Sequence, residues 1–148
     1  MKYRDKQGVK YHETEIKVRF NEIDAYQVAW HGHYVAWMEV GRNDLAGRFG
    51  LNANDIAAAG YLAPVVVLEL KFLRPARFAD ELRVRTSLKR METATLEFVS
   101  AIIGPDGKKC ATGKTVHSLT DKNGILLYSL PPVIRERVER LLAWQEGL

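Results

Sequence analysis

The spacing of the apolar positions changes near residue 30, and this change separates two predicted elements. Between Glu13 and Phe20, the residues Ile16, Val18 and Phe20 alternate with charged residues, which predicts a half-buried strand. From His33 onward the apolar residues recur every three or four positions, which predicts a helix of about four or five turns that ends near Gly50. The helix positions that share this face are Tyr34, Trp37, Met38, Gly41, Leu45 and Phe49.

The remaining segments predict a mostly antiparallel sheet. Asn52 and Asn54 are capping residues for a short helix over Asp55–Ala59. Turn-forming residues then separate a series of strand-like segments, and Pro131 and Pro132 precede a terminal amphipathic helix, Val133–Trp144. The expected strands are Ala63–Leu73, Glu81–Lys89, Thr93–Ile103 and Lys108–Leu119, with a short one at Ile125–Tyr128. This order predicts one α+β domain over residues 1–148, because a parallel sheet would need alternating strands and helices.

Composition excludes several classes of protein. With 148 residues, 47% of them hydrophobic and 27% charged, the chain fits one globular domain. The start of the chain has no apolar core typical of a signal peptide, and no apolar run is long enough to span a bilayer. The single Cys110 rules out an intrachain disulfide and lies in an alternating segment typical of a packed thiol. The net charge of +4 is scattered, which favours a small anionic ligand over nucleic acid.

The junction between the first strand and the long helix carries the candidate chemistry. Asp24 lies in a short loop after the strand, and the helix opens at His31. A carboxylate beside the positive end of a helix can attack an acyl carbonyl and stabilise the charge that develops on its oxygen. An aspartate at such a junction is also a common turn or capping residue, so position alone leaves both roles open.

The segment VRFNEIDAYQVAWHGHYVAWMEVGR, Val18–Arg42, resembles the hotdog-fold acyl-CoA thioesterases, in particular the branch of 4-hydroxybenzoyl-CoA thioesterase and YbgC. The matching features are Asp24, the loop 25–30, the helix start 31–34 and the pair Glu39 and Arg42. The resemblance extends over about residues 13–130. It implies a hotdog fold, in which an antiparallel sheet wraps around one long central helix. In this chain we expect a C-terminal helix, at about 132–145, in addition to that core.

The resemblance also implies an activity and a set of site residues. Asp24 would act as general base or nucleophile, two routes that the sequence does not separate, and the backbone N–H of His31 would bind the oxyanion. The implied reaction is hydrolysis of a small or medium acyl-CoA, aromatic or aliphatic, with no cofactor, because coenzyme A is part of the substrate. The substrate-binding residues would be Tyr26, Val28, Trp30, Gly32, Tyr34, Lys89 and Arg90.

Two departures from the family pattern concern the substrate. The loop after Asp24 often contains glycine in this family, whereas Tyr26 and Gln27 add bulk here. A basic cluster that binds the nucleotide phosphates in the 4-hydroxybenzoyl-CoA enzyme is replaced by residues 92–94, with Lys89 and Arg90 nearby as substitutes. The carrier, coenzyme A or acyl carrier protein, stays open.

Three alternatives use the same residues differently. A hotdog dehydratase or hydratase would use His31 or His33 as base with Asp24 as partner. A non-catalytic acyl-thioester binding protein would use Asp24 only as a cap. A metal site at His31 and His33 is disfavoured, because residues two apart on a helix point in different directions and no second ligand cluster is evident.

The family resemblance has further implications for assembly and location. Hotdog subunits pair their sheets edge to edge, so we expect a homodimer, further assembled into a homotetramer. The partner would contribute residues from Tyr61–Leu70. We expect a cytoplasmic protein without nucleic-acid partners or membrane insertion.

Overall fold

The computed structural model describes residues 2–4, 8 and 10–147. Its helices are α1 (His31–Gly47), α2 (Ala53–Ala58) and α3 (Pro132–Glu146), with a 3-10 turn η1 (Phe20–Glu22). The longer strands are β2 (Lys10–Lys17), β4 (Val65–Phe72), β5 (Glu81–Lys89), β6 (Thr95–Ile103) and β7 (Lys109–Ser118). The short strands are β1 (Lys2–Arg4), β3 (Tyr61–Leu62) and β8 (Thr120–Asp121).

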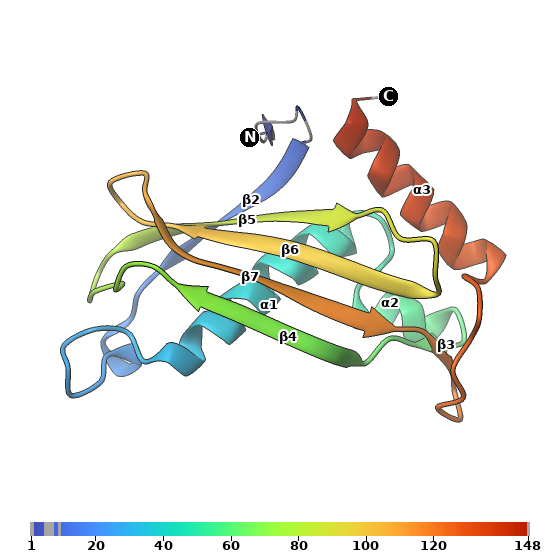
Figure 1. Cartoon of the computed structure of the whole chain (residues 1–148), viewed down its shortest axis with the longest axis horizontal. Helices are drawn as coiled ribbons and strands as arrows, with labels where there is room; N and C mark the ends of the chain where they lie inside the picture. Colours follow the sequence, from blue (N-terminus) through green and yellow to red (C-terminus); the bar gives the residue numbers. More distant parts are fainter. Residues whose placement is uncertain (1, 5–7, 9, 148) are drawn as a thin grey trace.

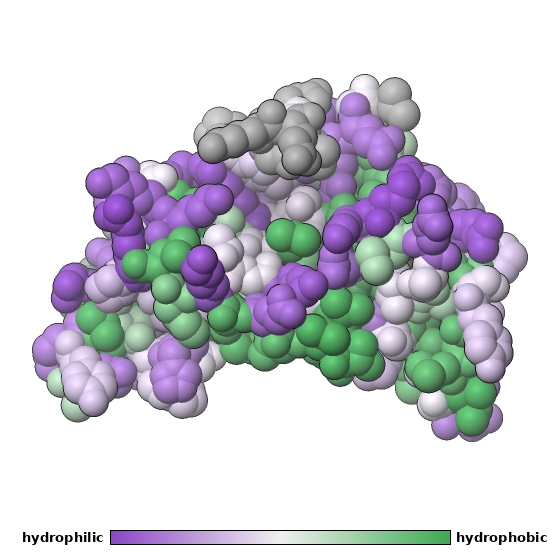
Figure 2. All heavy atoms as spheres, viewed as in Figure 1, coloured by the Kyte–Doolittle hydropathy of each residue, from purple (hydrophilic) through white to green (hydrophobic). Residues whose placement is uncertain are grey.

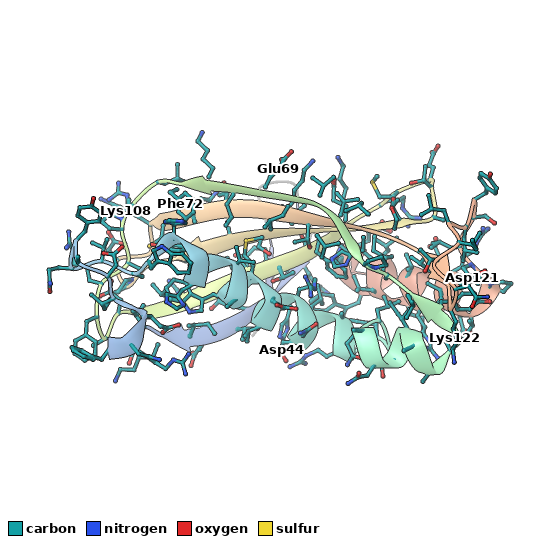
Figure 3. All side chains as sticks on the ribbon, turned by 90° about the horizontal axis from the view of Figure 1, so that it is seen from below. Asp44, Glu69, Phe72, Lys108, Asp121 and Lys122 are labelled. Atoms are coloured by element: carbon teal, nitrogen blue, oxygen red, sulfur yellow. The ribbon has the colours of Figure 1, made fainter. Side chains whose placement is uncertain are left out.

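Six strands form one antiparallel sheet in the order β1-β2-β5-β6-β7-β4, and β3 pairs with β8 separately. The helix α1 crosses one face of this sheet. Figure 1 looks onto the opposite face of the sheet, with α1 behind it, and Figure 3 shows the same arrangement turned by 90°. The fold expected from the resemblance, a sheet around one long helix with a C-terminal helix, is therefore present.

Alternation along the strands explains which face α1 covers. In β5 the residues at every second position are buried, from Leu82 through Val84 and Thr86 to Leu88. The predicted face of α1 packs against this row, and Gly41 allows the close approach, because a Cβ there would lie 2.5 Å from Val84 Cγ1. Burial of this apolar surface is the main stabilising contribution to the fold.

Side-chain bonds to the main chain fix the two smaller helices. Asn52 caps α2 by accepting a hydrogen bond from the N–H of Asp55 at 2.8 Å. Gln145 of α3 is 2% exposed and bonds both main-chain groups of Leu88, accepting from its N–H at 2.6 Å and donating to its carbonyl at 2.8 Å. These two bonds fasten α3 to the end of β5 (Figure 1).

Three expectations about the elements need correction. The first strand ends at Lys17, and Phe20 lies in η1 with 80% of its side chain exposed, because the chain turns there toward the loop. Residues 125–128 form no strand but one isolated bridge, Thr120 to Leu126. The reason is the carboxylate of Asp121, which accepts the N–H groups of residues 123 and 125 and closes a tight turn. The short strands β1, β3 and β8 were not predicted.

The strand β4 forms an edge of the sheet, with β7 as its one neighbour among the described strands. Most of its apolar side chains are exposed, from 39% at Val67 to 55% at Val66, whereas Leu70 is partly buried against the core. Figure 2 shows hydrophobic surface along the lower side of the molecule, where β4 lies in Figure 1. A long edge strand with exposed apolar residues is a pairing surface unless something covers it.

Candidate active site

The loop that carries Asp24 is a small hairpin held by main-chain bonds. A bridge between Ile23 and Ala29 closes it, and the Asp24 N–H donates to the Val28 carbonyl at 3.0 Å. At the tip, Gln27 has a φ of 64°, a left-handed conformation in which side chains other than glycine are strained. The Asp24 Oδ1 accepts the N–H of Tyr26 at 2.8 Å. Asp24 is therefore a turn-forming residue, which was one of the two roles that its position left open.

The hairpin is anchored to the rest of the fold on two sides. The Ala29 N–H donates to the Ala76 carbonyl at 2.8 Å, which ties the loop to the segment after β4. The Trp30 N–H donates to the Glu22 carbonyl at 2.9 Å, which ties it to η1. Asp24 is half-buried between these anchors, and its position therefore depends on main-chain geometry rather than on side-chain packing.

Glu22 is a buried carboxylate that the sequence analysis missed. Its side chain is 3% exposed, and its oxygens accept the Trp37 indole N–H at 3.0 Å and the Arg19 main-chain N–H at 2.7 Å. Burial opposes the charged form, but these bonds outweigh it and the pKa of Glu22 lies below its usual value. His33 Nδ1 is 3.9 Å away. The Glu22 carboxylate thus joins η1 to the central helix.

The first turn of α1 opens without a side-chain cap. The N-cap residue is Trp30, and its side chain accepts no hydrogen bond from the helix. Within the described residues, no acceptor is found for the N–H groups of His31 and Gly32, which is the usual state of an uncapped helix start. The Trp30 ring folds back over the turn, so that a Cβ at Gly32 would lie 2.1 Å from it. This glycine is needed for the ring to lie there.

A cavity of about 310 Å³ opens at this helix start. The loop and the helix contribute Val28, Ala29, His31 and Tyr34, and the end of β4 with the following segment contributes Phe72, Leu73, Arg74 and Pro75. We call it the helix-start cavity. The Tyr34 hydroxyl accepts the N–H of Ala76 at 3.0 Å, and the Tyr34 and Phe72 rings are 5.1 Å apart. Burial raises the pKa of Tyr34, so it stays neutral.

The structure brings together part of the expected site. Val28, His31 and Tyr34 line the helix-start cavity, and Asp24 is bonded to Val28 through its N–H. Trp30 covers Gly32 and stacks beside His31 with 4.9 Å between ring centres. The walls formed by Phe72 to Pro75 were missed, because no local pattern shows that β4 ends beside the start of α1.

Three expected substrate-binding residues lie elsewhere. Tyr26 points to solvent with 86% of its side chain exposed. Lys89 and Arg90 lie at the end of β5, whereas the Asp24 loop is bonded to Ala76, before the start of that strand. Lys89 pairs with Glu97 at 3.5 Å, and Arg90 pairs with Glu139 at 3.1 Å and with Glu146 at 3.3 Å.

The other residues that the sequence singled out lie outside the helix-start cavity. Glu39 and Arg42 form the expected ion pair at 3.1 Å, and Cys110 is a buried thiol whose pKa is raised by burial. Among the described residues, no group of three His, Cys, Asp or Glu side chains could hold a metal ion. None of the described helices is long and apolar enough to cross a membrane.

Residues 18–138 match the model of the family described as the thioesterase-like superfamily. This span contains the Asp24 loop, α1 and the whole helix-start cavity. The chain belongs to this superfamily. The resemblance found in the sequence is thereby confirmed, and with it the expectation of a thioester hydrolase at the level of the superfamily.

Individual relatives agree with this assignment. The chain is 29% identical to YneP of Bacillus subtilis, named as a candidate acyl-CoA thioesterase, over 73% of this chain and 78% of YneP. It is 24% identical to the acyl-CoA thioester hydrolase YbgC of Escherichia coli, over 62% of this chain and 68% of YbgC. A DHNA-CoA thioesterase from Staphylococcus aureus superposes with a TM-score of 0.80 at 23% identity, covering 93% of this chain and 95% of that one. This last likeness shows the hotdog fold alone.

Proposed function

We propose that this chain hydrolyses the thioester of a small or medium acyl-CoA, with Asp24 as base or nucleophile. The observation that carries the proposal is an uncapped helix start that opens on a mostly apolar cavity beside an anchored aspartate loop. The names of YneP and YbgC support the same reaction. The mixed aliphatic and aromatic lining, Val28 on one side and Phe72 on the other, accommodates either type of acyl group.

The proposed reaction begins with the carbonyl oxygen at the start of α1. The His31 N–H donates to this oxygen, and the positive end of the helix dipole stabilises the negative charge that develops on it. As base, Asp24 takes a proton from water while the water oxygen attacks the carbonyl carbon. As nucleophile, Asp24 attacks directly and forms an anhydride that water then hydrolyses. In both routes the carbon–sulfur bond breaks and the thiolate leaves with the electron pair.

The proposed thiol carrier is coenzyme A. Lys89 and Arg90 are not kept as ligands of its phosphates, because both lie at the far end of β5 from the helix-start cavity and pair with acidic side chains. The chain forms a dimer through the exposed edge of β4, and dimers pair to a tetramer. An acyl carrier protein as donor is the second candidate, and the assay below includes it.

The test is release of thiol from a panel of acyl-CoAs by the native protein and by Asp24→Asn. Asparagine keeps an oxygen that accepts the Tyr26 N–H, so this variant removes the charge and leaves the loop bond in place. We expect a loss of at least about two orders of magnitude in kcat, because the attacking group is removed. The matched control is Asp55→Asn, in the first turn of α2, which should keep native turnover.

Other outcomes would contradict the proposal in different ways. Turnover that survives in Asp24→Asn removes this residue from the mechanism and directs attention to His31 and His33. Hydration of an enoyl-CoA by the native protein supports the dehydratase alternative. Binding without turnover, on acyl-CoA and on acyl carrier protein alike, supports the non-catalytic alternative.

A further inference from the structure

A second cavity, of about 370 Å³, adjoins the helix-start cavity and has no role in the reaction proposed above. Arg74 and Pro75 line both cavities, so the two lie next to each other along the segment between β4 and β5. The other walls come from the rest of this segment, from the turn between β6 and β7 and from the start of β7. They are Arg77, Asp80, Gly104, Pro105, Asp106 and Cys110. We call this the arginine cavity.

The main chain that carries the two arginines is fixed along its length. The Arg74 N–H donates to the Cys110 carbonyl at 3.1 Å, and the Arg77 N–H donates to Asp80 Oδ2 at 2.9 Å. Between them, Ala76 is fully buried and is bonded both to α1 and to the Asp24 hairpin. Both arginines therefore start from main-chain positions that are set relative to the candidate active site. This preorganisation lowers the entropy that is lost when they bind a ligand.

The guanidinium groups of both arginines are accessible to a ligand. Within the described part of the chain, the Arg77 guanidinium has no hydrogen bond or ion pair. The Arg74 side chain is 52% exposed, and its Nη1 lies 3.9 Å from Asp106 Oδ2. An exposed ion pair of this kind contributes little to stability, so a phosphate group can displace Asp106 from Arg74.

The arginine cavity and the turn beside it carry more positive than negative charge. The two carboxylates, Asp80 and Asp106, each accept a main-chain N–H of a turn. The two arginines and Lys108, in the turn between β6 and β7, outnumber them. Figure 3 shows Lys108 at the same end of the molecule as Phe72, which lines the helix-start cavity. This charge favours an anion, and the planar fork of a guanidinium matches a pair of phosphate oxygens.

The distances allow one thioester to occupy both cavities. The rings of His31 and Phe72 are 6.4 Å apart at the start of α1. Five extended residues span at most about 18 Å, so Arg77 lies within that distance of Phe72. The pantetheine arm between the sulfur and the phosphates of coenzyme A has about as many main-chain bonds as four extended residues, roughly 14 Å. A thioester held at His31 therefore has its phosphates within reach of the arginine cavity.

We infer that the arginine cavity binds the phosphate groups of the thiol carrier, with Arg74 and Arg77 as their ligands. The inference rests on the proposed function and deepens it, because it assigns the part of the substrate that the helix-start cavity does not hold. It gives the carrier phosphates ligands at the same end of the fold as Asp24, in place of Lys89 and Arg90. Coenzyme A and the phosphopantetheine arm of an acyl carrier protein share this phosphate chemistry.

The first experiment compares a substrate that has phosphates with one that lacks them. Hexanoyl-CoA and hexanoyl-pantetheine are given to the native protein, to Arg74→Gln and to Arg77→Gln. We expect the KM for hexanoyl-CoA to rise at least about tenfold in each variant with kcat unchanged, because charge-assisted bonds to phosphate are lost. The KM for hexanoyl-pantetheine should stay at its native value. Arg135→Gln removes an exposed arginine of α3 and is the matched control for both substrates.

A variant with the opposite sign separates phosphate binding from a structural role. Asp106→Asn removes the anion that competes with phosphate for Arg74, while its side-chain oxygen still accepts the Lys108 N–H. We expect the KM for hexanoyl-CoA to fall about two- to fivefold, which corresponds to the strength of an exposed ion pair. The KM for hexanoyl-pantetheine should again stay unchanged. A KM for hexanoyl-CoA that rises in Asp106→Asn would contradict the inference.

The second experiment measures binding without turnover and identifies the source of the phosphates. Calorimetry with free coenzyme A should give a Kd at least about tenfold higher for the double variant Arg74→Gln/Arg77→Gln than for the native protein. Kinetics on a hexanoyl-acyl carrier protein then distinguish the two carriers. A rise in KM on both donors assigns the phosphate next to pantetheine, which both share. A rise on hexanoyl-CoA alone assigns the phosphates of its nucleotide.

The outcomes separate this inference from the proposed function. Native KM values for hexanoyl-CoA in both arginine variants, or an unchanged Kd for coenzyme A, overturn the inference while hydrolysis keeps the proposed function intact. Equal losses on hexanoyl-pantetheine also overturn it, because the arginines would then act through the fold. Binding of coenzyme A that depends on the arginines, without hydrolysis of either substrate, supports the phosphate site and overturns the proposed function.

Discussion

Replacement of Glu22 by glutamine gives a direct test of how the site is held. The two carboxylate oxygens accept hydrogen bonds from two donors, the main-chain N–H of Arg19 and the indole N–H of Trp37. Glutamine has one oxygen, so it can accept from one donor while its amide group faces the other. A buried donor left unpaired costs about 1–3 kcal/mol, and bonds to a charged acceptor are worth about 1.5–3 kcal/mol.

We therefore expect Glu22→Gln to lower the free energy of unfolding by about 2–4 kcal/mol at pH 7. For a domain of this size the melting temperature falls by about 2–4 °C per kcal/mol. Thermal and urea unfolding at pH 7 provide the measurement. Glu136→Gln, on the exposed side of α3, is the matched control and should leave the melting temperature unchanged.

The lowered pKa of Glu22 also predicts how the stability loss in Glu22→Gln changes with pH. The pKa of Glu22 is lower in the folded chain than in the unfolded one, so its contribution is complete above the unfolded pKa and is lost as the pH falls through the folded pKa. The difference in stability between native protein and Glu22→Gln should thus be largest near neutral pH and should shrink on acidification below about pH 4. A difference that is constant from pH 7 to pH 3 would refute the reasoning.

Two further predictions concern packing. Gly41→Ala should lower the free energy of unfolding by about 1–3 kcal/mol in thermal unfolding, because the added methyl would lie 2.5 Å from Val84 Cγ1. Gly47→Ala, also in α1, should cost less than Gly41→Ala, because its methyl would lie 3.3 Å from the side-chain amide nitrogen of Asn52, a less severe approach. Equal losses in both variants would contradict the close approach at Gly41. Gln145→Leu should cost about 2–4 kcal/mol in urea unfolding, because it leaves both main-chain groups of Leu88 without partners; an unchanged midpoint would contradict the role given to this side chain.

Local periodicity predicted the long elements well. The face of α1 from Tyr34 to Leu45 is buried as the spacing indicated, and Glu81–Lys89 is the strand that its alternation predicted. These elements depend on residues near one another in the chain, so a local pattern contains the information. The prediction that Phe20 lies in the first strand was wrong. The alternation of apolar and charged residues continues to Phe20, whereas the strand itself ends at Lys17 and the chain turns into η1.

The sequence alone predicted less of the site. Asp24 and the start of α1 were found because they are adjacent in the chain, and their catalytic roles stay a prediction. The opposite wall of the helix-start cavity, Phe72 to Pro75, depends on the order of the strands, in which β4 pairs with β7 and not with β5. Glu22 gave no signal either, since its burial arises from a contact with Trp37, fifteen residues later in the chain.

The way the Asp24 hairpin is anchored has a consequence for how this loop can evolve. Its position is fixed by main-chain bonds at Ile23, Ala29 and Trp30, whereas the side chains of residues 25–27 are exposed to solvent. Ala25 and Tyr26 can therefore change without displacing the aspartate, whereas the left-handed backbone of Gln27 favours glycine or asparagine at that position. Variants at positions 25 and 26 should keep both the native turnover and the native acyl preference, so the tip of the hairpin can drift in sequence while the reaction is inherited unchanged.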